Sequence, residues 1–223
     1  MTNGPARAAD NVPDWPWLAD ASGQRIALTA ELRARRAGPF SLAQIRSAAI
    51  TLGGINRYTG RQHVYWPDDA HSLLVGRIAR ALLPEAEPYG LAHELHEAWL
   101  SDMTTPYVTD LALWMGTSAV EQAIKAQKSF LDSLIFPALG LQWPMPAAIA
   151  DAVKRADLYA LDAERRDFFP ETPRWAHESP LLRTTVNRLV PERLKPVGAY
   201  SQTDRFWRAL CAACPGLPRP EAA

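Results

Sequence analysis

The sequence predicts an all-α fold, and two observations support this prediction. Between the prolines and glycines that punctuate the chain, apolar residues recur at steps of three or four, the spacing of a helix that buries one face. No run of any length alternates apolar and polar residues, as a half-buried strand would. One stretch near the start, QRIALTA, could form a short edge strand or a hairpin.

Five helices are expected along the chain. The first begins after Ser41, a good N-cap, and ends at Gly53 and Gly54, with apolar residues three or four positions apart between them. The other four are expected over residues 68–83, 89–102, 116–140 and 146–169. The chain contains no internal repeat.

The length of 223 residues is that of one substantial core with extensions. We expect a flexible N-terminus over residues 1–13 and a core over residues 14–170. Residues 171–223 are interrupted by prolines, so we expect them to wrap onto the core as an extended segment that ends in one short helix.

Charge and hydropathy limit the classes of partner. The chain has 24 Lys plus Arg and 24 Asp plus Glu, so it has no net positive charge that would attract it to a nucleic acid polymer or an anionic membrane. The sequence shows no signal peptide and no run approaching the ~20 apolar residues of a membrane span. We therefore expect a soluble, cytoplasmic protein with no membrane partner.

Two cysteines, Cys211 and Cys214, stand close together in the stretch CAAC. Without a second pair or a nearby histidine they form only half of a zinc site. Two reduced thiols are the favoured interpretation, and metal or redox chemistry is the alternative.

Histidines and carboxylates gather on three of the expected helices. In LAHELHEAWLSD, at 100° per residue, His93 and Glu97 fall near one helix face and Glu94 lies at its edge. His71 stands in an otherwise apolar helix, and Asp157 interrupts another, where an unpaired buried carboxylate would be costly. Spacing alone leaves two interpretations, hydrogen-bonded core or surface residues and a metal site.

The order of these residues resembles the HD-domain phosphohydrolases, specifically the small all-helical branch of 5'-deoxynucleotidases and phage deoxynucleoside triphosphate hydrolases. In that branch a histidine, a His-Asp pair and a later aspartate together hold one divalent metal ion. The positions of this chain that match are His71, His93, Glu94 and Asp157. The resemblance implies an HD-domain helical bundle with a proline-rich C-terminal extension, and it covers about Trp17 to Leu210.

Three further stretches carry the resemblance. HELHEAWLSDMTTP is similar to the His-Asp-Ala-His-Glu-Ala-Tyr stretch of the branch, and places Glu97 and Asp102 at its two acidic positions. GGINRYTGR resembles an Arg-aromatic element that contacts the nucleotide, which implies substrate binding by Arg57 and Tyr58. VKRADLYALDAERRDFF is similar to the segment that carries the final aspartate.

The resemblance implies metal-assisted hydrolysis of a deoxynucleotide, with Mg²⁺, Mn²⁺, Co²⁺ or Zn²⁺ as the one divalent ion. Asp102 would position or deprotonate the attacking water, and Glu97 would order water or assist the leaving group. Arg57 would donate two parallel hydrogen bonds to the phosphate, and Tyr58 would stack on or flank the sugar. Without the resemblance, a surface salt bridge for Arg57 and core packing for Tyr58 are equally good interpretations.

Glu94 departs from the family pattern, which has aspartate in this position. Glutamate keeps the charge but adds one methylene, about 1.5 Å of reach, and metal bonds tolerate only small displacements. We interpret the stretch as a working site with a longer carboxylate arm. The competing class is a non-catalytic nucleotide-binding or regulatory module whose metal site has degenerated.

Several assignments stay open at this stage. The substrate is a 5'-monophosphate or a triphosphate, and the latter needs further cations, for which the candidates are Arg61, Arg77, Lys125 and Lys128. His96 is expected to support the site or to pack, and His63 and His177 have no assigned role. Relatives in the family suggest a homo-oligomer, for which Trp15, Trp17 and Trp207 could supply the contact, although core packing is as good an interpretation.

Overall fold

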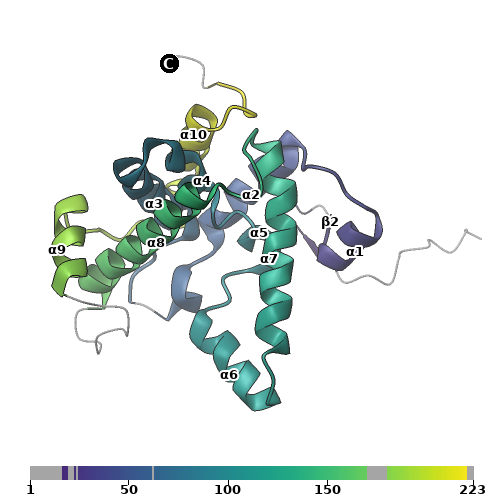
Figure 1. The fold of residues 1–223 in the computed structure, drawn as a ribbon, viewed down its shortest axis with the longest axis horizontal. Coiled ribbons are helices and arrows are strands. Elements are labelled where there is room, and N and C mark those ends of the chain that lie inside the picture. The colour runs from purple at the N-terminus through teal and green to yellow at the C-terminus, as the bar shows by residue number, and fades with distance from the viewer. Residues whose placement is uncertain (1–16, 20–22, 24, 62, 170–179, 220–223) are drawn as a thin grey trace, which may run out of the picture.

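The computed structural model describes residues 17–19, 23, 25–61, 63–169 and 180–219. Within these residues the fold is all-α, as predicted, with only one small two-stranded sheet (Figure 1). Strands β1 (Trp17–Ala19) and β2 (Arg25–Ala27) pair antiparallel, which confirms the short hairpin near the start. The expected flexible N-terminus, residues 1–13, lies outside the described residues.

The helices follow in order along the chain. They are α1 (Thr29–Ala34), α2 (Leu42–Gly54), α3 (Asp68–Leu82), α4 (Glu87–Ala92), α5 (Glu97–Leu100), α6 (Thr105–Met115), α7 (Ala119–Ala138), α8 (Ala147–Phe168), α9 (Pro180–Leu189) and α10 (Thr203–Ala213). Two 3₁₀ turns, η1 (Arg57–Gly60) and η2 (Pro84–Ala86), join them.

Helix α3 lies at the centre of the fold and packs against α2, α4, α8 and α10. Most of its apolar side chains are buried, and it crosses α4 where two glycines meet. A Cβ on Gly90 would lie 3.2 Å from the Cα of Gly76 and 2.9 Å from the Cβ of Ala79. This close approach brings the end of α4, and the histidines that follow it, against the start of α3.

The expected first helix is confirmed as α2, and its start has the predicted cap. The Ser41 hydroxyl accepts from the Gln44 backbone N–H, and the Gln44 side chain accepts from the Ser41 backbone N–H. This reciprocal pair satisfies two backbone donors that a helix end would otherwise leave unpaired. Helices α3, α7 and α8 confirm three more expected helices to within three residues at each end.

The prediction of one continuous helix over residues 89–102 was wrong. Helix α4 ends at Ala92 and α5 begins at Glu97, and the chain between them winds more tightly than an α-helix. Its backbone hydrogen bonds span three residues, from Leu95 N to Ala92 O (3.0 Å) and from Glu97 N to Glu94 O (2.9 Å). In such winding, side chains three positions apart lie in register.

Before the C-terminal segment, two helices were not predicted, α1 and α6. The sequence of α6 is apolar around most of its circumference, with Asp110 as its only charged residue, so it has no polar face to reveal a helical period. Figure 1 shows α6 beside one end of the long helix α7, projecting away from the rest of the fold.

The C-terminal segment contains two helices, α9 and α10, so the prediction of one short helix was wrong. In its described part, α9 packs on α8, and α10 packs on α2, α3 and α4. Cys211 and Cys214 are buried and free, and burial raises the pKa of Cys214 to about 12, which favours unreactive reduced thiols. Nowhere in the part of the chain that the structure describes is a helix both long and apolar enough to cross a bilayer.

Candidate metal centre

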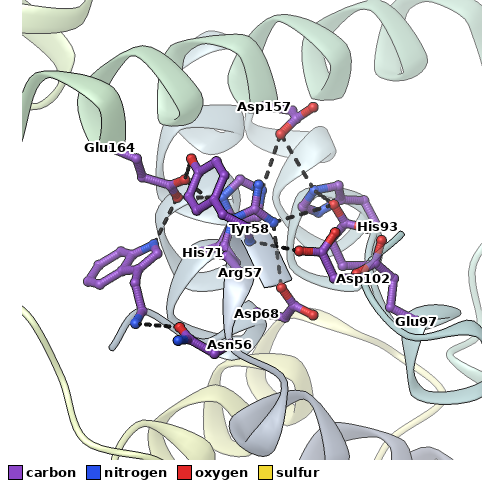
Figure 2. Close-up of polar contacts among 12 residues, drawn as sticks. Asn56, Arg57, Tyr58, Asp68, His71, His93, Glu97, Asp102, Asp157 and Glu164 are labelled. Atoms are coloured by element: carbon purple, nitrogen blue, oxygen red, sulfur yellow. Dashed lines mark hydrogen bonds and ion pairs between the residues drawn. The ribbon is translucent and has the colours of Figure 1, made fainter. Parts of the chain in front are cut away.

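The four predicted metal ligands come together from three parts of the fold. His71 lies on α3, His93 and Glu94 lie in the tight turn between α4 and α5, and Asp157 lies on α8. One ligand atom from each of His71, His93 and Glu94 lies within 4.8 Å of the others. Figure 2 shows Asp157 facing both histidines, with its Oδ1 3.2 Å from His71 Nε2 and 4.0 Å from His93 Nε2.

Both histidines are held in the orientation that metal ligands need. The Nδ1–H of His71 donates to Glu164 Oε1 (2.6 Å), and the Nδ1–H of His93 donates to the Gly90 carbonyl (2.7 Å). These acceptors keep the proton on Nδ1 and turn the Nε2 lone pair toward the centre. Both Nε2 atoms are buried without a hydrogen-bond partner. A divalent cation fits this donor set, since it could bind both Nε2 atoms together with the carboxylates that face them, Asp157 at 3.2 Å from His71 Nε2 and Glu94 at 3.5 Å from His93 Nε2.

The longer side chain of Glu94 still reaches the centre. Its Oε1 lies 3.5 Å from His93 Nε2 and 3.8 Å from Arg57 Nη1. Burial would raise the pKa of Glu94, but His93, His96 and Arg57 lower it well below its usual range, so the carboxylate is ionised. The extra methylene therefore leaves a charged oxygen available to a metal at this position.

Glu164 is a central residue of the site that the sequence analysis did not assign. It is fully buried on α8 and accepts four hydrogen bonds. The donors are His71 Nδ1 (2.6 Å), Tyr58 Oη (2.6 Å), Trp66 Nε1 (2.8 Å) and Arg57 Nε (3.3 Å). Burial would raise the pKa of Glu164, but Arg57 and His71 lower it to about 2. Its position seven residues after Asp157, two turns along one helix face, is the signal that could have revealed it.

Arg57 lies among carboxylates and is only 7% exposed. Its Nε donates to Glu164. Its Nη1 lies 3.6 Å from Asp68 Oδ1 and 3.8 Å from Glu94 Oε1. Burial would lower the pKa of Arg57, but these neighbours and Tyr58 raise it. Asp68 lies three residues before His71 on the same helix face, and the sequence analysis did not assign it either. Burial raises the pKa of Asp68 to about 7, and the nearby charge of Arg57 opposes this shift.

Tyr58 and Asp102 are joined to each other and to the centre. The backbone N–H of Tyr58 donates to Asp102 Oδ2 (2.9 Å), which ties η1 to the end of α5. Tyr58 adopts a left-handed backbone conformation with φ 57°, which costs roughly 1–3 kcal/mol for a residue other than glycine. Its hydroxyl is held by Glu164, so the Arg-Tyr element is fixed beside the candidate metal ligands.

Glu97 faces the same region from the first turn of α5. Its Oε1 accepts from Lys128 Nζ (3.1 Å), whereas its Oε2 is buried without a hydrogen-bond partner. Burial and the nearby carboxylates of Glu94 and Asp68 raise the pKa of Glu97. Together with Glu94 and His96, Glu97 forms a second group of potential metal ligands whose donor atoms lie within 4.8 Å of one another.

The other cations proposed for a longer phosphate chain lie elsewhere. Of these four candidate cations, only Lys128 is seen to pair with a residue of the site, Glu97, within the described residues. Arg61 and Lys125 are exposed, and Arg77 is exposed and pairs with Glu192 at 3.5 Å. His63 is exposed, and His177 lies outside the described residues.

No family model matches this chain. No curated protein matches it either.

Proposed function

We propose that the protein is a metal-dependent phosphohydrolase of the HD-domain type that acts on deoxynucleotides. The observation that supports this most directly is the convergence of the buried Nε2 atoms of His71 and His93 on the carboxylates of Glu94 and Asp157. Two imidazoles and two carboxylates form a donor set for a divalent ion such as Mn²⁺, Co²⁺ or Zn²⁺, and Mg²⁺ is the fourth candidate.

The ion would be held by His71, His93, Glu94 and Asp157. When bound, it supplies a Lewis acid that offsets the negative charge growing on a phosphate under attack by water. Asp102, half-buried beside the centre, would accept a proton from that water or orient it. Glu97, whose Oε2 is unpaired, would order water or assist the leaving group.

Arg57 and Tyr58 would contribute to substrate binding from η1. Arg57 carries its positive charge into a region of several carboxylates, where it lowers the repulsion that an incoming phosphate meets. The Tyr58 ring, held in place by its hydroxyl, would flank the sugar. Lys128 is the one additional cation paired at the site among the described residues. Both 5'-monophosphates and triphosphates therefore belong in the test.

The test is turnover by purified protein, stripped of metal and reloaded with Mg²⁺, Mn²⁺, Co²⁺ or Zn²⁺, on a panel of deoxynucleoside mono- and triphosphates. Release of phosphate identifies a monophosphatase and release of triphosphate identifies a triphosphohydrolase. His93→Ala should abolish turnover, and the matched change at an exposed histidine, His63→Ala, should leave it intact.

Absence of turnover with every metal and substrate, together with retained nucleotide binding, would support the non-catalytic binding or regulatory module instead. A homo-oligomer and a cytoplasmic location stay predictions. Trp207 is partly buried, with Arg46 6.0 Å from its ring, whereas Trp15 and the side chain of Trp17 lie outside what the structure describes.

A further inference from the structure

A third histidine has the same arrangement as the two in the proposed centre, yet that centre does not use it. The Nδ1–H of His96 donates to Asp132 Oδ1 (2.9 Å), which leaves its Nε2 with a lone pair. His96 is 6% exposed, and its Nε2 is buried without a hydrogen-bond partner. A carboxylate that holds Nδ1 while Nε2 stays unpaired is the usual environment of a metal-binding histidine.

The two oxygens of Glu94 face different histidines. Oε1 lies 3.5 Å from His93 Nε2, and Oε2 lies 3.7 Å from His96 Nε2. A carboxylate in this position can bind one cation through each oxygen. The methylene that distinguishes glutamate from aspartate places the carboxylate far enough from the backbone to lie between the two imidazoles.

The tight winding of residues 92–99 explains why the ligands come in matched pairs. Because the hydrogen bonds span three residues, His93 lies in register with His96, and Glu94 lies in register with Glu97. Glu97, whose Oε2 is buried without a hydrogen-bond partner, belongs to the second group, in which one donor atom from each of the three residues lies within 4.8 Å of the others. Ligands on a metal with bonds of about 2.0–2.2 Å lie at most about 4.4 Å apart, so only a small side-chain movement is needed.

Carboxylates gather around the two groups of ligands. The carboxylates of this region are those of Asp68, Glu94, Glu97, Asp102, Asp132, Asp157 and Glu164. Arg57 and Lys128 pair with some of them, and the carboxylates outnumber these two cations. Lys128 takes up only Oε1 of Glu97 and leaves Oε2 available.

We propose that Glu94 bridges two divalent cations. The first is the ion of the proposed function, on which this inference rests, and the second is held by Glu94 Oε2, His96 Nε2 and Glu97 Oε2. Imidazole with two carboxylates suits Mn²⁺, Co²⁺, Fe²⁺ or Zn²⁺. Two ions that share a carboxylate lie about 3.5–4 Å apart, a spacing at which both can contact one phosphate group.

The test is the number of ions bound by the full-length, metal-stripped protein, measured by equilibrium dialysis with Mn²⁺ or Zn²⁺ and elemental analysis. The wild-type chain should bind two equivalents, and its Mn²⁺ form should show the electron paramagnetic resonance signal of a coupled pair. His96→Gln removes the Nε2 ligand with little change in size, and Glu94→Asp withdraws the bridging carboxylate. Each should weaken the second equivalent at least tenfold and abolish the coupled signal, and His96→Gln, which leaves every ligand of the first ion in place, should retain the first equivalent.

The exposed His63→Gln is the matched control and should still bind two ions, and circular dichroism of each variant checks that it is folded. One equivalent in the wild type, lost in His93→Ala, would overturn the bridge and leave the proposed function standing. Two equivalents that persist in both His96→Gln and Glu94→Asp would also overturn it, because the second ion would then lie elsewhere. No bound ion in the wild type would overturn both proposals.

Discussion

His71 and Glu164 form a fully buried pair, with Nδ1 of the imidazole 2.6 Å from Oε1 of the carboxylate. The two residues lie on α3 and α8, 93 positions apart in the sequence. The contact orients the imidazole, holds a proton on Nδ1 and turns Nε2 toward the other candidate metal ligands. It also links the candidate metal centre to Arg57, Tyr58 and Trp66, which share the same carboxylate.

Replacing Glu164 by Gln should weaken metal binding and the fold together. Loss of the carboxylate that orients a metal-binding histidine typically costs 10–100-fold in affinity. It also leaves Arg57 without its closest partner in a buried site, which should destabilise the protein by about 3–5 kcal/mol. Isothermal titration with Zn²⁺ and chemical unfolding of the metal-free protein measure the two effects.

The matched control lies on the same helix. Asp151→Asn removes an exposed ion pair with Arg155 (2.9 Å), and such a pair contributes about 0–1 kcal/mol. Metal affinity should be unchanged in this control. Equal losses in the two variants would mean that Glu164 acts only through the stability of α8.

Metal affinity should rise with pH through the neutral range. Burial would lower the pKa of His71, but Glu164 and Asp157 raise it to about 9. Below that pH a metal ion has to displace a proton, so affinity should increase about tenfold per pH unit from pH 7 to 9 and then level off. Titration calorimetry in buffers of different ionisation enthalpy should detect the released proton. An affinity that does not change with pH would contradict the role of His71 as a ligand.

The same pair should make the metal-free fold less stable as the pH rises. The pKa of His71 is about 9 in the folded state and about 6.5 in an unfolded chain. Its stabilising contribution is therefore complete below pH 6.5 and is lost as the pH rises toward 9. The melting temperature of the metal-free protein at pH 6.5 and at pH 9 measures this loss. Glu164→Gln should reduce the difference, and an unchanged difference would show that other groups cause it.

Removing the metal should lower the melting temperature. An ion present at 100 times its dissociation constant stabilises the folded state by about 2.7 kcal/mol. For a chain of this length that corresponds to roughly 5–11 °C. Differential scanning calorimetry with and without a chelator provides the measurement. His93→Ala should show no such difference, and a chelator effect that survives this substitution would place the ion elsewhere.

The cap of α2 provides a prediction about the fold that is independent of the metal. Ser41→Ala removes the acceptor for the Gln44 backbone N–H and should destabilise the protein by about 1 kcal/mol. Ser41→Gly should cost only a few tenths of a kcal/mol, since glycine is tolerated at this position. Urea unfolding distinguishes the two, and equal effects would show that the hydroxyl contributes nothing.

Local pattern determined much of the fold. The spacing of apolar residues predicted α2, α3, α7 and α8, because a helix that buries one face repeats its apolar positions whatever it packs against. The same pattern failed for α6, which lacks a polar face. It also failed for residues 93–96. There the backbone hydrogen bonds join residues three apart instead of four apart, and the spacing of apolar residues does not reveal this change.

The order of histidines and acids along the chain was sufficient to select His71, His93, Glu94 and Asp157, which the structure brings together. It did not assign Glu164 or Asp68, since neither belongs to the motif and each acts through a partner on another element. By itself the sequence determined the spacing of apolar and polar residues, and with it helices α2, α3, α7 and α8. Only the packing of α3, α4 and α8 decided which side chains meet, because contacts across helices depend on crossing points such as Gly76 and Gly90, where the backbones come close.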